Sequence, residues 1–536
     1  MAPPKFMGLS GRPLSMTVSA VATTGFLLFG YDQGVMSGII SAPAFADMFP
    51  ETRNNPTMQG LVTAIYEIGC LMGAMLILWS GDLLGRRRGM IMGSVIMIIG
   101  AVIQVTCFKA ECSKTSNRGL LICIEGGIIA FGTLIAYWLD YGASFGPPDL
   151  QWRFPIAFQI VFGLVVGICM IFLPESPRWL LLHERYEDAE RVISGLRGHE
   201  IDSRETRLER DVILDSIRAS GFGGRKTTPF RALITNGKTQ HFRRMMLGAS
   251  SQLMQQVGGC NAVIYYFPIL FEETIVRGDH NLALLMGGVN MIVYSIFATV
   301  SWFIIERVGR RKLFLYGTIG QGLSMVIAFS CLISGDSNHA KGAAVGLFTY
   351  IASFGATWLP LPWLYPAEIN PIKTRAKANA VSTCTNWLFN FLIVMVTPIM
   401  ISDIGWGTYL FFAVVNACFL PVIWWFYPET AKRSLEEIDI IFAKGHVEGK
   451  SYVKAAEELP LLSDEQVEQE ALKYGLIETA ARGAMHAHGH ADATVEKGLS
   501  EKESVESSRA EVAKEGSAGS GSGDGSNSNE NAAGGQ

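Results

Sequence analysis

Charge is scarce in this sequence. Of its 536 residues only 17% are charged, while 49% are apolar. Soluble domains carry about a quarter of charged residues. The apolar residues also stand in long blocks and do not alternate with polar ones at the period of a surface helix or strand. Together these features exclude an ordinary soluble globular protein.

Several functional signatures are absent as well. Eight of the nine cysteines lie inside apolar blocks, so the sequence indicates no disulfide framework. We find no ATP-site motif and no catalytic triad, and the net charge of −4 points to no particular partner. We therefore expect that the chain is not an enzyme and uses no cofactor, metal or nucleic acid.

Eleven apolar blocks are long enough to cross a bilayer, which takes about 20 residues in a helix. A β-barrel is excluded because its strands are shorter and alternate in polarity. We predict an all-α polytopic membrane protein. The blocks cover about residues 17–40, 58–80, 90–108, 119–142, 154–173, 245–270, 283–304, 312–334, 343–365, 377–400 and 406–427.

Polar segments divide these blocks into two groups. Residues 1–173 are predicted to form an N-terminal bundle of five spans, and residues 245–427 a C-terminal bundle of six. Residues 174–244 carry 14 Lys or Arg and should form a cytoplasmic helical linker. Residues 428–536 should form a cytoplasmic tail, disordered after about residue 507, where apolar residues become too few to fold.

Three short phrases occur twice, in the same order. GDLLGRRRG follows the block at 58–80, and ERVGRRKL follows the block at 283–304. PESPRW and PETAKR follow the last block of each half. The third pair is AECSKTSNRG and AEINPIKTRA. Such a duplication predicts two homologous bundles, the plan of the major facilitator superfamily, with the substrate site between them.

The spacing of these phrases differs between the halves. The offset is 224 at Gly-Arg-Arg but 257 at Ala-Glu and 254 at Pro-Glu. About 33 residues, one helix with its loop, are therefore missing from the first half, at the place of the fourth helix of six. The basic segments agree, because twelve spans could place all of them on the cytoplasmic side and eleven cannot.

As a set, the motifs GYDQG, GDLLGRRRG, PESPRWL, QQVGGCNAVIYY, ERVGRR, LPLPW and PETAKRSLEEI resemble the fungal sugar porters of the major facilitator superfamily, over about residues 15–445. The residues of these motifs are similar to those of fungal hexose and xylose:proton symporters. The resemblance implies alternating access, a monosaccharide and a proton as substrates, and a plasma-membrane location in the lipid bilayer. Two alternatives stay open: a transporter-like sugar sensor, and an inactive splice or gene-model product that lacks one helix.

The resemblance also implies a pyranose site. Sugar hydroxyls are read by amide side chains and by an aromatic face. A helix break at Gly258-Gly259 would let neighbouring amides turn inward. The competing interpretation is that intramembrane amides only hold helices together. The implied substrate-binding residues are Gln255, Gln256, Asn261, Asn290, Trp363 and Asn386.

Asp32 is the implied proton-coupling residue, since a carboxylate inside a membrane span costs at least about 2.5 kcal/mol and is functional by default. In similar symporters an arginine of the fourth helix acts on this aspartate, and that arginine is missing here. Glu125 is either a substitute or a group facing a polar cavity.

The duplicated phrases resemble the family's cytoplasmic salt-bridge latch, while their simpler interpretation is positive-inside anchoring. The implied latch residues are Asp82, Arg86, Arg87, Glu111, Arg118, Glu175, Arg178, Glu306, Arg310, Arg311, Glu368, Arg375 and Glu429.

Overall fold

The computed structural model describes residues 3–53, 55–106, 122–219, 230–272, 279–334, 337–371 and 374–476. Within these ranges every named secondary-structure element is a helix. Residues 1–463 form one compact unit and residues 464–536 a second, whose described part contains α20 (Asp464–Lys473). The predicted disorder after about residue 507 lies outside the described residues.

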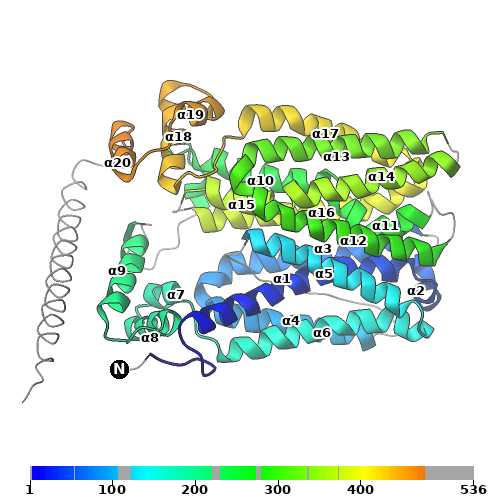
Figure 1. Cartoon of the computed structure of the whole chain (residues 1–536), viewed down its shortest axis with the longest axis horizontal. Coiled ribbons are helices and arrows are strands. Elements are labelled where there is room, and N and C mark those ends of the chain that lie inside the picture. Colours follow the sequence, from blue (N-terminus) through cyan, green and yellow to red (C-terminus); the bar gives the residue numbers. More distant parts are fainter. Residues whose placement is uncertain are drawn as a thin grey trace, which may run out of the picture. The chain divides into compact units, whose positions relative to one another are not determined.

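The first half contributes long helices that begin at prolines or polar caps and consist mostly of apolar residues (Figure 1). Asn55, for example, caps α3 by accepting a hydrogen bond from the backbone N–H of Met58. The helices are α1 (Arg12–Ser41), the short α2 (Pro43–Met48) and η1 (Pro50–Thr52), α3 (Pro56–Leu84), α4 (Arg86–Thr106), α5 (Ile122–Ala143) and α6 (Pro148–Phe172).

The second half contains the same kind of helices, two of them interrupted. They are α10 (His241–Val257) with α11 (Cys260–Phe271), α12 (His280–Val308), α13 (Arg310–Leu332), α14 (Ser337–Ser353) with the π-helical turn η4 (Phe354–Trp358) and α15 (Leu361–Ile369), α16 (Arg375–Ile404) and α17 (Gly407–Phe426). Short connections reverse the chain between consecutive spans, so these helices alternate in direction.

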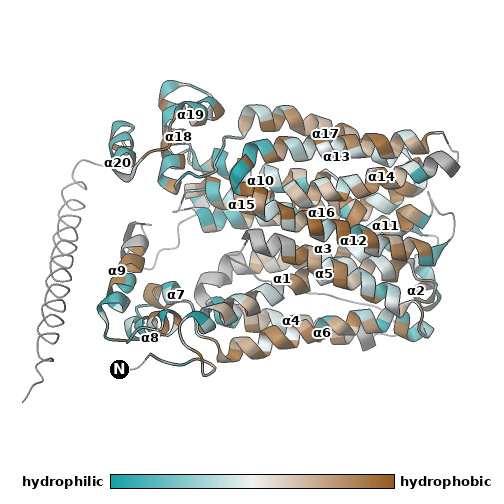
Figure 2. Ribbon diagram, viewed as in Figure 1, coloured by the Kyte–Doolittle hydropathy of each residue, from teal (hydrophilic) through white to brown (hydrophobic). Residues whose placement is uncertain are grey.

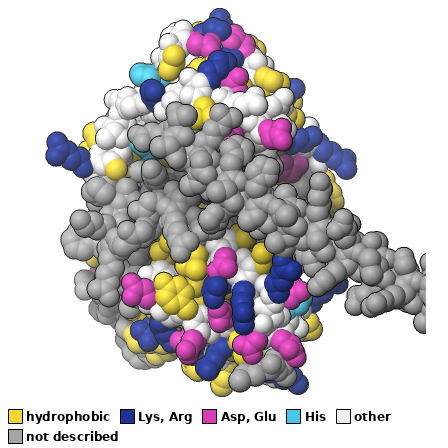
Figure 3. Space-filling view, turned by 90° about the vertical axis from the view of Figure 1, so that its left-hand side faces the viewer, with side chains coloured by type: hydrophobic (Ala, Val, Ile, Leu, Met, Phe, Trp, Pro, Cys, Tyr) yellow, Lys and Arg dark blue, Asp and Glu magenta, His cyan; other side chains and the backbone are white. Residues whose placement is uncertain are grey.

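Polar, amphipathic helices lie at one end of the long helices. The linker forms α7 (Pro177–Leu182), α8 (Tyr186–Arg197), α9 (Arg204–Ala219) and η2 (Phe230–Ile234), and the chain after the last span forms α18 (Leu435–Glu448) and α19 (Tyr452–Glu458). Figure 2 shows the contrast between these hydrophilic helices and the hydrophobic long ones, and Figure 3 shows Lys, Arg, Asp and Glu side chains gathered at this end. We call it the linker end.

Eight of the described helices are long and apolar enough to cross a membrane. The prediction of an all-α polytopic membrane protein is therefore confirmed. The number of eleven spans remains a prediction, as do the domain boundaries at residues 173, 244 and 427.

Helices α1 and α4 both begin at the linker end. Ser15 Oγ at the start of α1 donates a hydrogen bond to the carbonyl of Leu196 in α8 (3.0 Å). The backbone N–H of Arg86 at the start of α4 donates to Glu175 Oε1 (2.9 Å), just before α7. Both helices therefore run away from the linker end.

Helix α5 runs in that direction too. Gly30 of α1 lies against Ile129 of α5, and Gly38, further along α1, lies against Asp140, further along α5. Because residue numbers increase in the same direction along both helices, α1 and α5 are parallel. The first bundle thus has two consecutive long helices, α4 and α5, that point the same way, and this does not occur in the second bundle.

Candidate substrate site between the two bundles

The predicted break in the first helix of the second bundle is confirmed. α10 ends at Val257, Gly259 has φ +100°, and α11 begins at Cys260. A Cβ on Gly259 would stand 2.8 Å from the ring of Phe412, so both its backbone angle and the close packing require glycine. Tyr350 Oη donates to the freed carbonyl of Gly258 (2.9 Å), which satisfies that group without water.

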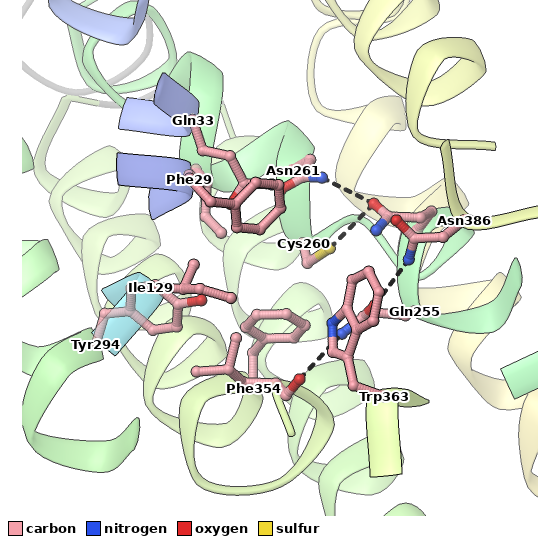
Figure 4. A pocket seen from close by; sticks show the side chains of 13 residues that line it. Phe29, Gln33, Ile129, Gln255, Cys260, Asn261, Tyr294, Phe354, Trp363 and Asn386 are labelled. Carbon is pink, nitrogen blue, oxygen red and sulfur yellow. Dashed lines mark hydrogen bonds between the residues drawn. The ribbon is translucent and has the colours of Figure 1, made fainter. Parts of the chain in front are cut away.

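A narrow cavity, with about 20 Å³ of space for water, lies beside this break. Residues from both bundles line it, and Figure 4 shows Phe29 and Gln33 of α1 opposite Gln255 and Asn386 of the second bundle. The lining residues are Phe29, Gln33, Ile129, Gln255, Gln256, Cys260, Asn261, Ile264, Tyr294, Phe354, Leu359, Trp363 and Asn386. Five of the six predicted sugar-binding residues are therefore brought together.

Some of these amides are fixed by the protein itself. Gln255 Nε2 donates to the carbonyl of Trp358 (2.8 Å), and its Oε1 accepts from Asn386 Nδ2 (3.0 Å). Asn386 Nδ2 also donates to Gln252, whose Nε2 donates to the carbonyl of Pro362 (2.6 Å). These bonds join α10, α16 and the interrupted helix α14–η4–α15 on one side of the cavity.

Other amides keep groups available. Gln256 Oε1 accepts from Asn261 Nδ2 (2.8 Å), and no hydrogen bond involves Gln256 Nε2 within the described part of the chain. The same holds for the side-chain amide of Gln33. A polyol entering the cavity would thus meet donors and acceptors from both bundles, together with the aromatic faces of Phe29, Tyr294 and Trp363.

Asn290 is the predicted site residue that does not line the cavity. It is fully buried in α12, and neither polar atom of its side chain has a hydrogen-bond partner among the described residues. Sequence reasoning missed Gln33 and Phe29, which line the cavity from α1. The sequence could have suggested Gln33, because it stands next to Asp32 in the motif GYDQG. The direction of its side chain, however, depends on how α1 packs.

Asp32 lies on α1 beside Gln33 but does not line the cavity. Its Oδ1 is buried and has no hydrogen-bond partner, and no ion pair to Asp32 occurs in the described ranges. It lies close to Tyr66 and Cys70 of α3. The position of Glu125 within α5 is described, but its side chain is not.

The duplicated Gly-Arg-Arg phrases form two matching structures. Glu175 accepts hydrogen bonds from the backbone N–H groups of Arg86 (2.9 Å) and Arg87 (3.1 Å) at the start of α4. Glu429 likewise accepts from Arg310 (2.7 Å) and Arg311 (3.1 Å) at the start of α13. A carboxylate is favourable there because the first N–H groups of a helix lack partners inside the helix.

The glycines that precede these helices make room for the carboxylates. Gly85 has φ +80° and ψ 170°, and Gly309 has φ +95° and ψ 160°, a region essentially restricted to glycine. A Cβ on Gly309 would stand 2.5 Å from Glu429 Oε2, and one on Gly85 would stand 2.6 Å from Glu175 Oε2.

We expect Gly309→Ala to destabilise the protein by about 2–4 kcal/mol, because it combines backbone strain with displacement of a carboxylate that binds two N–H groups. The measurement is thermal unfolding of the detergent-solubilised protein. Gly449→Ala is the control, since Gly449 has φ +65° but no atom within 4 Å of a Cβ, so its cost should be limited to about 1 kcal/mol. Equal losses for both variants would contradict the role of Glu429.

True ion pairs among the predicted latch residues centre on Arg310. Its guanidinium is 4% exposed and lies 2.6 Å from both Glu306 and Glu368. Glu368 also accepts from Thr430 Oγ1 (2.6 Å). This cluster joins α12, α13 and α15 with the segment that follows α17.

The remaining latch residues are less uniform. Arg87 donates through Nε to the carbonyl of Met170 (3.0 Å), and Arg375 donates to the carbonyl of Asn370 (3.3 Å), not to Glu368. Arg178 of the linker lies near Arg375, which brings the two halves together at this end. The side chain of Asp82 is not described, and Glu111 and Arg118 lie outside the described residues.

Comparison with known proteins places the chain in a family. The family described as "Sugar (and other) transporter" matches residues 18–110 and 105–442. Sugar transporter STL1 of Saccharomyces cerevisiae is 43% identical over 505 aligned positions, covering 87% of this chain and 88% of that protein. The major facilitator superfamily transporter mfsA of Aspergillus fumigatus is 42% identical, covering 88% of this chain and 93% of that protein.

Solved structures agree on the fold. The xylose transporter XylE from E. coli in a partially occluded inward-open conformation has a TM-score of 0.65 at 20% identity, covering 79% of this chain and 100% of that one. XylE with bound 6-bromo-6-deoxy-D-glucose has a TM-score of 0.64 at 22% identity, covering 80% and 99%. The chain therefore belongs to the sugar transporter family of the major facilitator superfamily, a family of multi-pass membrane carriers and not of enzymes.

Proposed function

We propose that this protein carries a monosaccharide, hexose or pentose, across the plasma membrane by alternating access, in symport with a proton. The observation that carries the proposal is the cavity at the bundle interface. Gln255 and Asn386 lie opposite Gln33 in it, and Gln256 and the aromatic face of Trp363 also line it. Relatives named as sugar and glucose transporters support the substrate class.

The architecture supplies the moving parts. Two helices that reach the cavity are interrupted, one at Gly258-Gly259 and the other at η4, and interrupted helices can bend without moving a whole bundle. The clusters around Arg310, Glu175 and Glu429 fix the linker ends of the helices within each bundle. Rocking of the bundles would expose the cavity to one side and then to the other.

The test is transport in proteoliposomes by the purified chain with a fourth helix restored, with radiolabelled glucose, xylose and glycerol as probes. We expect saturable exchange of one or both monosaccharides, and accumulation only when the outside is acidic. Absence of binding and of exchange for both monosaccharides, or exchange of glycerol alone, would contradict the proposal. A sensor would instead bind sugar without any flux, and no described feature favours that alternative.

For the proton, we expect Asp32→Asn in the same helix-restored chain to end pH-driven accumulation while sugar exchange continues. Asparagine keeps the shape of the side chain but cannot bind a proton, and Asp32 lies next to cavity-lining Gln33 without touching the cavity itself. The measurements are uphill uptake under an imposed pH gradient and counterflow without one. The control is Asp149→Asn, an exposed carboxylate at the start of α6. Persisting accumulation would place the proton site elsewhere.

We also infer that the chain lacks one helix of its first bundle, between α4 and α5. The parallel course of these two helices supports this, since an intervening helix would return the chain to the linker end. The family match supports it too, because its two stretches meet at residues 105–110. Finally, 87% of 536 residues is about 466, so about 40 of the 505 positions aligned with STL1 are gaps in this chain.

A further inference from the structure

A second acidic side chain is buried where the two bundles meet. Glu67 of α3 is 0% exposed. Its Oε1 accepts a hydrogen bond from Tyr265 Oη of α11 (2.7 Å), and its Oε2 is buried without a well-aligned hydrogen bond in the described part of the chain. Because α3 belongs to the first bundle and α11 to the second, this bond must break whenever the bundles separate at this level.

Glu67 is also linked to the cavity amides. The side-chain amide of Asn390 of α16 interacts with Glu67, while its Oδ1 accepts a hydrogen bond from Asn261 Nδ2 (2.6 Å). Asn261 Nδ2 donates in turn to Gln256 Oε1 (2.8 Å). Asn261 and Tyr265 lie one turn apart on α11 and therefore share a face. A sugar that moves Asn261 must disturb both contacts of Glu67.

Among the described residues, the groups around Glu67 supply no counter-cation. They are Tyr66 and Cys70 on its own helix, Cys260, Tyr265 and Tyr266 from α11, and Asn390 from α16. Asp32 of α1 shares Tyr66 and Cys70 with Glu67 as neighbours. On the neighbouring α4 the charged residues are Arg86, Arg87 and Arg88, at its linker end. A carboxylate in such surroundings is costly unless it is neutralised, and here a proton is the available cation.

We propose that Glu67 is a second proton-binding residue, which holds the bundles together through Tyr265 and senses the substrate through Asn390 and Asn261. With its proton, Glu67 is neutral and keeps the bond to Tyr265 in a dry interface. When the interface opens, its O–H bond breaks, the proton passes to water, and the carboxylate is stabilised by hydration. This inference rests on the proposed transport function for its link to sugar, whereas the bound proton itself does not.

The test combines a readout without sugar and one with it, both on the full chain in lipid nanodiscs. Infrared spectroscopy would follow the C=O stretch of protonated carboxyl groups as pH is raised and as glucose or xylose is added. We expect Glu67→Gln to remove one component of this band, and Asp32→Asn to remove a different one. Tyr265→Phe, which keeps the ring, should shift the Glu67 component without removing it. Glu51→Gln, an exposed carboxylate, is the control.

Sugar binding gives the second arm. We expect the wild-type affinity to fall with rising pH by up to about tenfold per pH unit where the group titrates, and this slope to be reduced in Glu67→Gln. An unchanged pH-dependent band in Glu67→Gln would overturn the proton site. If the band is lost but sugar binding has the same pH slope as wild type, the link to substrate is wrong. If no variant binds sugar, the transport proposal fails while the band still decides whether Glu67 holds a proton.

Discussion

Replacing Gln256 with alanine is expected to lower monosaccharide affinity by 10- to 100-fold and leave the fold intact. Gln256 Nε2 has no partner within the described residues, so it is a donor available to a sugar hydroxyl, and its Oε1 orients Asn261. Each lost hydrogen bond costs about 0.5–1.5 kcal/mol, and the variant loses one bond directly and one through Asn261. The measurement is equilibrium binding of glucose and xylose to purified protein.

A matched control separates lost recognition from lost stability. Gln321 of α13 is also a buried glutamine, 3% exposed, and it does not line the cavity. Gln321→Ala should therefore leave affinity within about twofold of wild type, with a similar unfolding temperature in both variants. Saturation binding unchanged in Gln256→Ala would remove this residue from the site.

The sequence predicted those parts of the site that depend on local backbone geometry. Two adjacent glycines in an apolar block indicated a broken helix, and the structure breaks the helix at Gly259. It did not predict which way each amide faces. Asn290 stands on an unbroken helix, where its direction is set by packing against other helices, and it does not line the cavity. Gln33 faces the cavity because the close approach of α1 and α5 at Gly30 fixes the rotation of α1.

The latch shows a similar limit. A sequence that places acids near arginines suggests ion pairs, and Arg310 does form them with Glu306 and Glu368. Glu175 and Glu429, however, bind backbone N–H groups at the starts of α4 and α13. Every residue except proline has a backbone N–H group, so residue types do not identify these donors. Only the three-dimensional path of the chain reveals this role of the two glutamates. The glycine repeated before each helix was the feature of the sequence that was related to this role.

The second large effect, on membrane insertion and sugar uptake, depends on the segment between α4 and α5. Both helices run away from the linker end, and fifteen residues, 107–121, join the end of one to the start of the other. As a helix, fifteen residues span about 22 Å, less than the roughly 30 Å of hydrocarbon. As an extended chain they could reach, but their backbone groups would then lack hydrogen-bond partners in lipid. The membrane therefore opposes this arrangement.

The pseudo-equivalent helix of the second bundle shows what is lost. α13 packs along both α14 and α17, whereas among the described helices α4 packs mainly along α6. Helix association in lipid depends on such close packing, since burial of apolar surface from water gives no drive there. We expect this chain, expressed as it stands, to insert poorly, to be retained inside the cell and to take up little sugar.

Inserting the fourth helix of yeast STL1, with its loop, between Lys109 and Ala110 should raise uptake at least tenfold and move the protein to the cell surface. The inserted helix would return the chain to the linker end, so that α5 and the basic linker take the orientation that the positive-inside rule favours. The control is an insert of equal composition with its sequence shuffled, which supplies length and apolarity but not the matching packing surface. Uptake is measured with labelled sugar, and orientation by labelling single cysteines placed in the linker from either side of the membrane. Equal uptake and equal labelling of the original chain and the restored one would show that the first bundle works with five helices, because a protein that already crosses the membrane correctly gains nothing from the added one.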